Sequence, residues 1–410
     1  METHDMIIIG GGASGVFLSL LLKDYGKDVA LLEGKDRILK KLLTTGNGRC
    51  NITNAKVMEE IPSVYTTSLV GYDFAPLKTF PLSETLSYFM SLGLHFTTLE
   101  DHKMYPLSLQ AASVVDLLRL AMEDKGVPLY LNEKVKTIQK KGGFFHLATG
   151  EKTYACKYLI ISTGGMAAPS TGSDGSLFKA LKTFGHEIIP PRPALVQMNL
   201  EAPFLKALSG VKMDGKASLY QGNTLLKEAS GELLFTDYGI SGPPILQLSR
   251  FLHPHLHQGA PLTLKLSFFN ELTEEDLKAL LLNQAALFPH RSAMDVCRSI
   301  LPKKLTPVVL REAGMEKPSA LIFENDPKHL VQLASLLKGW SFTVTGTQGF
   351  ALAQGTYGGV AMNEVKPTLE STIVSNLYFT GEVLDVLGAC GGYNLQWAWS
   401  TAGTVFKALT

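Results

Sequence analysis

The first glycine-rich segment, Gly10 to Gly15, has the residue types and spacing to bind a phosphate anion. Gly10, Gly12 and Gly15 form the pattern GxGxxG, directly after an apolar run and at the start of a helical one. The first glycine permits a tight turn, the second lets a pyrophosphate approach the backbone, and the third lets the helix pack closely on the strand. Because free N–H groups converge at the start of a helix, the segment predicts a dinucleotide site.

A carboxylate at the expected distance supports this interpretation. Glu33 follows Gly10 by 33 − 10 = 23 residues, at the end of the next apolar run. There it can accept hydrogen bonds from the ribose hydroxyls, and it would repel a 2′-phosphate. NADP is therefore disfavoured at this site, whereas NAD and FAD both remain open.

The cysteines could also do chemistry, but none of them belongs to a recognisable catalytic or metal-binding motif. The four cysteines, Cys50, Cys156, Cys297 and Cys390, form no CxxC pair, so neither a zinc site nor a thioredoxin-type motif is indicated. Cys50 as a redox-active thiol is a weaker hypothesis, with Cys390 as its candidate partner. The catalytic residues stay unknown.

The histidines likewise belong to no recognisable catalytic or metal-binding motif. His253, His255 and His257 alternate around Pro254 without a nearby carboxylate or cysteine, which favours a solvated loop over a metal site. His186 follows Gly185, and we interpret it as satisfying backbone groups at a helix end. No metal site is predicted.

The elements that must position the glycine turn form a β-α-β unit. Residues 6–9 and 28–32 are continuous apolar runs, and residues 13–25 have helical apolar spacing. Continuous runs predict a parallel sheet covered on both faces. A helix is expected over 110–124, strands over 127–131, 134–139, 143–148 and 158–162, and a second glycine-rich strand-helix unit over 376–409.

The character of the sequence changes between about residues 190 and 345. Pro190, Pro191 and Pro193 mark a boundary. Short β-type runs follow at 195–200, 217–220, 231–235 and 261–267, and residues 273–340 have mostly helical periodicity. We expect an insertion with a small β-barrel part and a helical part.

Composition limits the classes of protein. The 410 residues are 45% hydrophobic and 18% charged, which is typical of a folded globular protein. The net charge is +1 with no basic stripe, so no nucleic-acid partner is predicted. The apolar stretch 6–22 lacks a basic n-region and contains glycines, and no run is long enough for a membrane span. We expect no membrane partner and a cytoplasmic location.

Three further segments resemble Rossmann-type flavoproteins. Residues 158–165 (YLIISTGG) resemble the strand that returns past the bound cofactor, and residues 377–382 (LYFTGE) resemble the C-terminal strand ending in Gly-Asp or Gly-Glu. Residues 391–394 (GGYN) follow at a helix start, where N–H groups can face the pyrimidine edge of a flavin. The resemblance implies FAD rather than NAD.

The fullest match is to one bacterial NAD(P)/FAD-dependent oxidoreductase family, whose members are labelled bile-acid-precursor reductases or aminoacetone oxidases. Residues 40–54 (KKLLTTGNGRCNITN) are similar to its signature, as are residues 231–243, 355–367 and 381–398. One stretch departs from it, because His102 to Pro106 stands where a Gly-Arg-Val-Phe-Pro-like sequence is expected. This puts a contact from that arginine in doubt.

The resemblance implies an α/β fold: a Rossmann-like FAD-binding domain formed from both termini, with an inserted β-barrel domain carrying a helical subdomain. The expected boundaries are 1–190 for the first part of the FAD domain, 191–270 for the barrel, 271–340 for the helical subdomain, and 341–410 for the return strand and the C-terminal part of the FAD domain.

The motif and the resemblance together give the predicted cofactor-binding residues. They are Gly10, Gly12, Ala13, Ser14, Gly15, Glu33, Gly34, Lys41, Thr45, Gly46, Asn47, Gly48, Arg49, Cys50, Asn51, Val135, Thr163, Gly164, Gly165, Gly381, Glu382, Asp385, Gly391, Gly392, Tyr393 and Asn394.

The predicted function is an FAD-dependent reductase that uses NAD(P)H on a small organic substrate. No second GxGxxG is present, so NADH or NADPH is expected to bind transiently against the flavin. We expect the substrate between the flavin and the inserted domain, near Tyr105, Tyr357 and Tyr393. An amine or alcohol oxidase and a flavin-bound regulatory or macromolecule-binding protein without turnover remain alternatives. The oligomeric state is not predicted.

Overall fold

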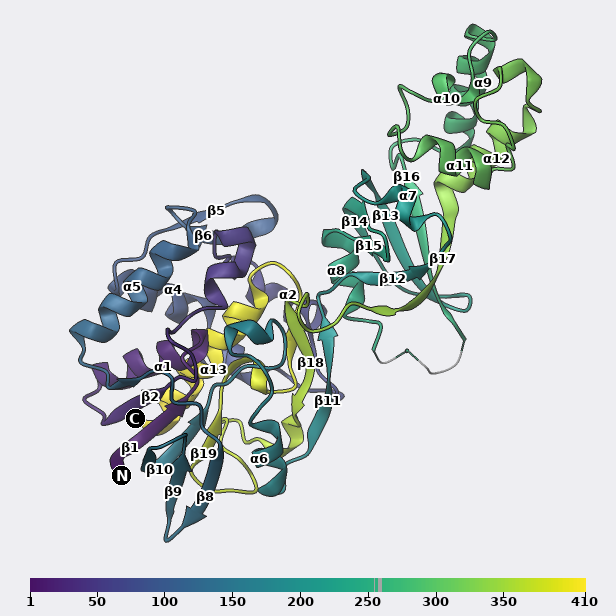
Figure 1. Cartoon of the computed structure of the whole chain (residues 1–410). Helices are drawn as coiled ribbons and strands as arrows, with labels where there is room; N and C mark the ends of the chain where they lie inside the picture. The colour runs from purple at the N-terminus through teal and green to yellow at the C-terminus, as the bar shows by residue number, and fades with distance from the viewer. Residues whose placement is uncertain (254, 257–259) are drawn as a thin grey trace. The chain divides into compact units, whose positions relative to one another are not determined.

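The computed structural model describes residues 1–253, 255–256 and 260–410 (Figure 1). They divide into two compact units, the first comprising Met1–Ala194 with Phe350–Thr410 and the second Leu195–Gly349. Each unit has its own buried apolar core. The first unit is therefore built from two segments separated in sequence by the second.

The first unit contains a seven-stranded sheet in the order β7-β2-β1-β10-β9-β8, with β19 also paired to β10. β1, β2, β7, β10 and β19 run parallel, and β8 and β9 form an antiparallel edge. Continuous burial of β2 reflects coverage of both faces, as expected for a parallel sheet. The strands are β1 Glu2–Ile9, β2 Val29–Leu32, β7 Leu129–Tyr130, β8 Thr137–Lys141, β9 Phe144–Ala148, β10 Thr153–Ile161 and β19 Leu377–Phe379.

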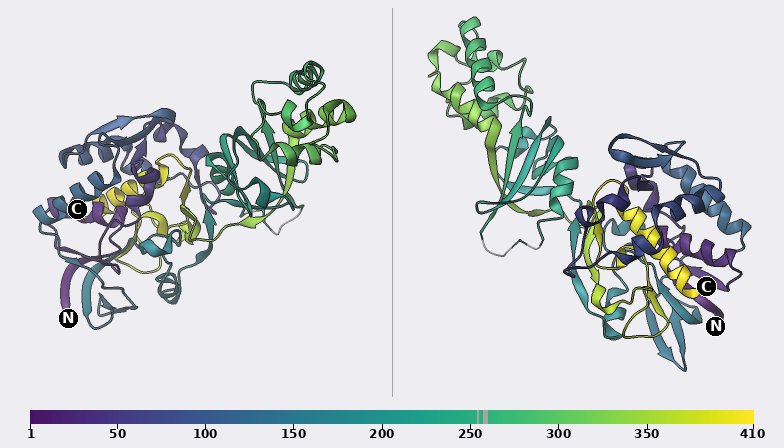
Figure 2. Two further views of the ribbon diagram at one scale, coloured as in Figure 1. Left: turned by 45° about the horizontal axis from the view of Figure 1, so that its top comes forward. Right: turned by 180° about the vertical axis from the view of Figure 1, so that it is seen from behind.

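Two helices from opposite ends of the chain pack together in the first unit. α1 (Ala13–Asp24) lies beside α13 (Tyr393–Leu409), as Figure 2 shows in its right-hand view. The rings of Phe17 and Trp399, both fully buried, have centroids 5.2 Å apart. This aromatic contact fixes the glycine turn before α1 relative to the C-terminal segment.

Smaller elements complete the first unit. They are α2 Val57–Val64, α3 Ala75–Thr79, α4 Leu82–Ser91, α5 Ala111–Asp124, α6 Phe178–Thr183, β3 Thr53–Asn54, β4 Tyr65–Thr66, β5 Phe96–Thr98, β6 Lys103–Pro106 and β20 Leu387–Gly388, with short 3₁₀ turns η1 Leu42–Gly48, η2 Glu100–His102, η3 Pro169–Thr171, η5 Met362–Glu364 and η6 Gly381–Val383. β3, β5 and β6 form one small sheet, and β4 pairs with β20.

The prolines interpreted as a boundary lie in the strand that ends where the first unit gives way to the second, at Ala194. β11 (Ile188–Ala194) pairs antiparallel with β18 (Gly355–Val360), and the register shifts between Ile189 and Arg192. Pro190 and Pro191 occupy this irregularity, and within the described part of the chain the sheet consists of these two strands. Proline is tolerated at a bulge or on an unpaired strand edge because its missing N–H is not needed there.

The second unit is a closed antiparallel barrel with helices. The strand order is β12-β15-β14-β13-β16-β17, and the burial of β16 alternates as expected for a strand with one face in a core. The strands are β12 Met198–Glu201, β13 Lys212–Gln221, β14 Thr224–Phe235, β15 Gly239–Ser241, β16 Leu262–Phe268 and β17 Trp340–Thr347. The helices are α7 Leu205–Leu208, α8 Pro243–Ser249, α9 Glu274–Leu287, α10 Ala293–Val296, α11 Thr306–Glu312 and α12 Lys328–Gly339, with the 3₁₀ turn η4 Ile322–Glu324.

The predicted fold class is confirmed: a Rossmann-like α/β sheet assembled from both ends, and an inserted barrel with helices. The strand expected at 134–139 is shifted to Thr137–Lys141, and residues 134 and 135 precede it and line a cavity. None of the described helices combines the length and the apolar character needed to cross a membrane.

Candidate dinucleotide site

A cavity lies where β1, β2, β10 and β19 end. The space between its lining residues is about 1400 Å³, a volume that also counts solvent at the open side. All of its lining residues belong to the first unit. The predicted cofactor-binding residues that line it are Gly10, Gly12, Ala13, Ser14, Glu33, Gly34, Lys41, Thr45, Val135, Thr163, Gly164, Gly381, Glu382 and Asn394. Those outside its lining are Gly15, Gly46, Asn47, Gly48, Arg49, Cys50, Asn51, Gly165, Asp385, Gly391, Gly392 and Tyr393.

The three glycines of the turn have different surroundings. Gly10 has φ +112°, and a Cβ there would lie 2.4 Å from the carbonyl oxygen of Ser162. A Cβ at Gly15 would lie 2.0 Å from the carbonyl oxygen of Gly10, whereas a Cβ at Gly12 would meet no atom within 4 Å. The first and third glycines are thus required by packing, and the second faces open space.

The start of α1 is electrostatically suited to an anion. Gly12 is the N-cap residue and supplies no side-chain cap, and the first turn contains no acidic residue. The unpaired N–H groups and the positive end of the helix dipole therefore face the cavity. This is the arrangement that binds phosphate groups at helix starts.

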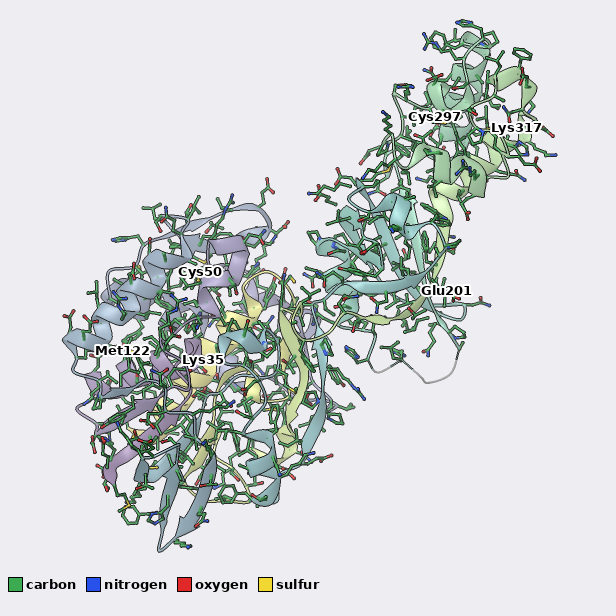
Figure 3. All side chains as sticks on the ribbon, viewed as in Figure 1. Lys35, Cys50, Met122, Glu201, Cys297 and Lys317 are labelled. Atoms are coloured by element: carbon green, nitrogen blue, oxygen red, sulfur yellow. The ribbon has the colours of Figure 1, made fainter. Side chains whose placement is uncertain are left out.

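The Glu33 carboxylate is held in a fixed orientation beside the glycine turn. Its Oε2 accepts a hydrogen bond of 2.7 Å from the Gly11 N–H, and its Oε1 accepts one of 2.8 Å from the Lys35 N–H. Lys35 is labelled in Figure 3. Burial raises the pKa of Glu33, although these N–H donors oppose the rise. Each oxygen keeps a further lone pair, so the carboxylate can still accept from hydroxyl groups.

The C-terminal segment reaches the same cavity. Gly381 has φ +73°, and a Cβ there would lie 2.8 Å from Ser14 Oγ in the first turn of α1. The hydroxyl groups of Ser162 and Thr380, at the ends of β10 and β19, lie 2.6 Å apart. The glycine turn and the closing strand therefore meet at one site, as the sequence predicts.

Glu382 and Lys41 form an ion pair at the cavity wall. Lys41 Nζ donates to Glu382 Oε2 over 2.7 Å, and both side chains are about a quarter exposed. The Thr356 N–H donates to Glu382 Oε1, also over 2.7 Å. The pair joins residues 341 positions apart in sequence, so it appears only in the folded chain.

The segment from Gly46 to Cys50 has a compact, left-handed backbone. Gly46, Asn47, Gly48 and Cys50 all have φ between +55° and +82°. Arg49 is exposed, whereas Cys50, labelled in Figure 3, is fully buried. Burial raises the pKa of the Cys50 thiol to about 12. At neutral pH Cys50 is therefore a thiol rather than a reactive thiolate.

The second glycine-rich helix start is closed by packing. A Cβ at Gly392 would lie 2.4 Å from the Thr53 carbonyl carbon. With its amide oriented to satisfy both of its ends, Asn51 accepts from the Gly392 N–H over 3.0 Å and donates to the Thr53 carbonyl oxygen over 2.9 Å. Tyr393 is buried, and its carbonyl oxygen accepts from the Tyr65 hydroxyl over 2.7 Å. Of this segment's predicted residues, Asn394 lines the cavity.

Two more predicted residues make structural contacts away from the cavity lining. Asp385 is buried and accepts from the Ser68 N–H over 2.9 Å, and its burial raises its pKa. Gly165 packs on Thr356, whose hydroxyl oxygen accepts from the Met166 N–H over 2.8 Å. Both contacts fix loops that flank the site.

The sequence interpretation of His186 was wrong for its side chain. Nδ1 lies 3.1 Å from Glu364 Oε2, and Nε2 lies 2.9 Å from Ser371 Oγ. The order Ser-His-Glu is that of a hydrolase triad, but the Ser371 residue is 1% exposed and does not line the cavity. Its hydroxyl also accepts from the Ile373 and Val374 N–H groups, which indicates a structural cluster.

Several cavity residues were missed by sequence reasoning. They are Lys35, Arg37, Lys40, Lys134, Gln354 and residues 171–174, 176 and 177 of one loop. The nearest sequence signal is the Gly-Ser-Asp-Gly stretch from 172 to 175, which does not complete a second GxGxxG pattern. Among the described residues, no group of three potential metal ligands is present, and His257 lies outside them.

The donor set fits an FAD-type dinucleotide. An open helix start for a pyrophosphate, a half-buried carboxylate for ribose hydroxyls, and a second wall from the C-terminal segment line one cavity. The open space above Gly12 is the cradle that a pyrophosphate needs.

Comparison with known proteins gives the family. The family model described as the HI0933-like protein Rossmann domain matches residues 4–407. The chain is 38% identical to the 3-dehydro-bile acid delta(4,6)-reductase of Clostridium scindens over 96% of both chains. It is 32% identical to the ribosomal RNA dihydrouridine synthase of Escherichia coli, over 98% of this chain and 97% of that one.

A solved structure shares the fold at low identity. It is the 3-ketosteroid delta1-dehydrogenase of Sterolibacterium denitrificans, with a TM-score of 0.51, 10% identity and full coverage of both chains. The predicted family, the predicted enzyme class and the predicted cofactor, FAD, are confirmed. The chain belongs to the HI0933-like Rossmann-domain family and is an FAD-dependent oxidoreductase.

Proposed function

We propose that this protein is an FAD-dependent reductase that takes a hydride from NADH or NADPH and saturates a carbon–carbon double bond conjugated to a carbonyl group. The observation that carries the proposal is the 38% identity, over 96% of both chains, to a protein named as a bile-acid reductase. The substrate we propose is a small organic molecule of that type, an oxo-steroid with conjugated double bonds.

The residues we assign to FAD follow from the cavity. The N-terminus of α1, from Gly12 to Ser14, would hold the pyrophosphate, and the Glu33 carboxylate would accept from the adenosine ribose. Lys41, Glu382 and Asn394 line the part of the cavity formed with the C-terminal segment, where we place the flavin half. The predicted cofactor residues outside the cavity lining would support its walls.

The chemistry divides between the cofactor and the chain. When bound, FAD supplies a ring that can accept a hydride from a nicotinamide and return it to an electron-poor carbon. Overall, NAD(P)H and one proton are consumed, and the double bond gains two hydrogens. The chain contributes binding and orientation: Lys41 and Glu382 fix one wall, and the rigid glycine turn fixes the other.

A second candidate comes from the same chemistry on another substrate class. Two relatives, from Escherichia coli and Haemophilus influenzae, are named as ribosomal RNA dihydrouridine synthases and are 32% and 31% identical over 98% of this chain. Dihydrouridine also arises by saturation of a double bond conjugated to a carbonyl. The net charge of +1 disfavours a nucleic-acid substrate, and so does the higher identity to the bile-acid enzyme.

The test is an anaerobic reaction with NADH or NADPH and each substrate. We expect the purified protein to carry FAD, to be bleached by one nicotinamide, and to remove the ultraviolet absorbance of a 3-oxo-4,6-diene bile acid. The matched control is the same steroid without the double bonds. Unmodified ribosomal RNA, analysed by mass for dihydrouridine, serves as the competing substrate.

The other outcomes separate the alternatives. Turnover of RNA alone would replace the proposed substrate with the second candidate. Oxygen uptake on amines or alcohols with no response to either nicotinamide would indicate an oxidase. A flavin that reacts with no donor would favour a binding protein without turnover.

A further inference from the structure

A loop far in sequence from the glycine turn forms part of the same cavity. Residues 171–174, 176 and 177 all line it. A Cβ at Gly172 would lie 3.7 Å from Glu33 Oε1 and 3.5 Å from Lys35 Cγ. The loop therefore faces the carboxylate to which we assign the adenosine ribose.

Polar contacts hold this loop in place. Lys134 Nζ forms an ion pair of 2.6 Å with Asp174 Oδ2, and Asp174 Oδ1 accepts from the Ser176 N–H over 3.0 Å. The Thr171 hydroxyl donates to the Ala168 carbonyl oxygen over 2.7 Å. The loop is thus positioned without help from a ligand.

Ser173 is the exception among the polar side chains of the loop. The residue is 7% exposed, and its Oγ is buried without a hydrogen-bond partner among the described residues. A Cβ at Gly164, another cavity residue, would lie 2.8 Å from this oxygen. A buried hydroxyl without a partner is unfavourable, and buried polar groups in proteins nearly always have one. The missing partner is expected to come from the cavity.

We propose that the Ser173 hydroxyl hydrogen-bonds directly to the adenosine half of bound FAD, at a sugar or phosphate oxygen. The contact rests on the proposed cofactor site and deepens it. A hydroxyl can donate one hydrogen bond and accept two, so it suits either oxygen. The Lys134–Asp174 ion pair positions the loop that carries Ser173.

The first experiment measures FAD binding to the apoprotein by quenching of flavin fluorescence. We expect Ser173→Ala to raise the Kd for FAD about tenfold, which corresponds to the loss of one ordinary hydrogen bond. Ser170→Ala is the matched control, because Ser170 is exposed, lies two residues before Gly172 and is outside the cavity lining. The control should bind FAD within twofold of the unchanged protein.

The second readout separates ligand binding from structure. Because Ser173 Oγ has no partner among the residues that the structure describes, the Ser173→Ala apoprotein should melt at the same temperature as the unchanged apoprotein or higher. ADP, which carries the adenosine half alone, should compete with FAD less well by the same factor.

Each contrary result has a distinct meaning. An unchanged Kd for FAD overturns the contact, and so does a weaker affinity accompanied by a lower melting temperature of the apoprotein. Weaker FAD binding with unchanged ADP competition overturns the assignment to the adenosine half. Absence of FAD binding by the unchanged protein would instead overturn the proposed function.

Discussion

Two helices of the first unit begin after glycine-rich turns, and the two helix starts differ in accessibility. Gly12 precedes α1 and Gly392 precedes α13. A side chain at Gly12 would extend into empty space, whereas one at Gly392 would collide with the backbone of Thr53. The first start opens into the cavity, and the second is filled by the protein itself.

The polar groups follow the same division. The start of α1 has no side-chain cap, while the Gly392 N–H before α13 is 3.0 Å from the Asn51 amide oxygen. Similar sequence patterns therefore produce an open helix start in one place and a packing contact in the other. A glycine motif predicts a helix start, and only tertiary packing decides whether its N–H groups are available.

The largest expected effect is a loss of FAD affinity when a side chain fills the open space at the start of α1. Gly12→Leu should weaken FAD binding at least about 100-fold, because the side chain would occupy the space that a pyrophosphate needs. The φ of Gly12 is −82°, so the substitution should cost the apoprotein less than about 1 kcal/mol. Flavin fluorescence titration and apoprotein melting measure the two effects. Retained FAD affinity would show that this helix start does not hold the cofactor.

The second effect is a loss of stability when a side chain is added at the tightly packed start of α13. Gly392→Ala should lower the free energy of unfolding by about 2 to 4 kcal/mol, because φ is +94° and the new Cβ would meet Thr53. Urea unfolding of the apoprotein measures it. Gly150→Ala is the control, since Gly150 is exposed and a Cβ there meets nothing. Equal stability of the two variants would remove the distinction between the helix starts.

A smaller effect tests the carboxylate beside the open start. Glu33→Gln keeps the shape of the side chain and one acceptor oxygen, but it removes the charge and the second acceptor. We expect the Kd for FAD to rise about tenfold, as for the loss of a charge-assisted hydrogen bond. Asn51→Asp, beside the closed start, provides the comparison, and its Kd should change less than that of Glu33→Gln. A larger rise in Kd for Asn51→Asp than for Glu33→Gln would place the cofactor at the start of α13 rather than at the start of α1.

The smallest effect concerns pH. Burial raises the pKa of Glu33 above its ordinary value of 4.5, so the folded protein binds this proton more tightly than the unfolded chain does. This contribution to stability is complete below pH 4.5 and is lost as the pH rises through the folded pKa. Urea unfolding at pH 4.5 and pH 7 should show the apoprotein losing stability relative to Glu33→Gln. An unchanged difference would mean that Glu33 is as well solvated as in the unfolded chain.

The sequence was most informative where chemistry and local structure coincide. The glycine turn, Glu33 and the strand ending at Gly381 all follow from short patterns, and the structure brings them to one cavity. The hydroxyl of Ser173 and the Lys41–Glu382 pair could not be found in this way, because their partners are set by tertiary contacts between distant segments.

Tertiary contacts also decide details that local patterns leave out. Pro190 and Pro191 lie within β11, where a bulge against β18 accommodates them, and the boundary between the two units follows directly after this strand. Gly185 follows the end of α6, as the pattern predicts, but the imidazole of His186 contacts Glu364 and Ser371, which come from much later in the chain.

The pairing of β19 with β10 sets the order of events during biosynthesis. Their ends, marked by Ser162 and Thr380, are 218 residues apart, a stretch that a ribosome produces in roughly 11 to 44 seconds. Throughout that delay Leu159, Ile160 and Ile161 lack one of their two strand neighbours, since β1 is already made and β19 is not. A nascent chain therefore carries an apolar strand edge exposed to misassembly, and it can close its nucleotide pocket only after the whole inserted unit has been made.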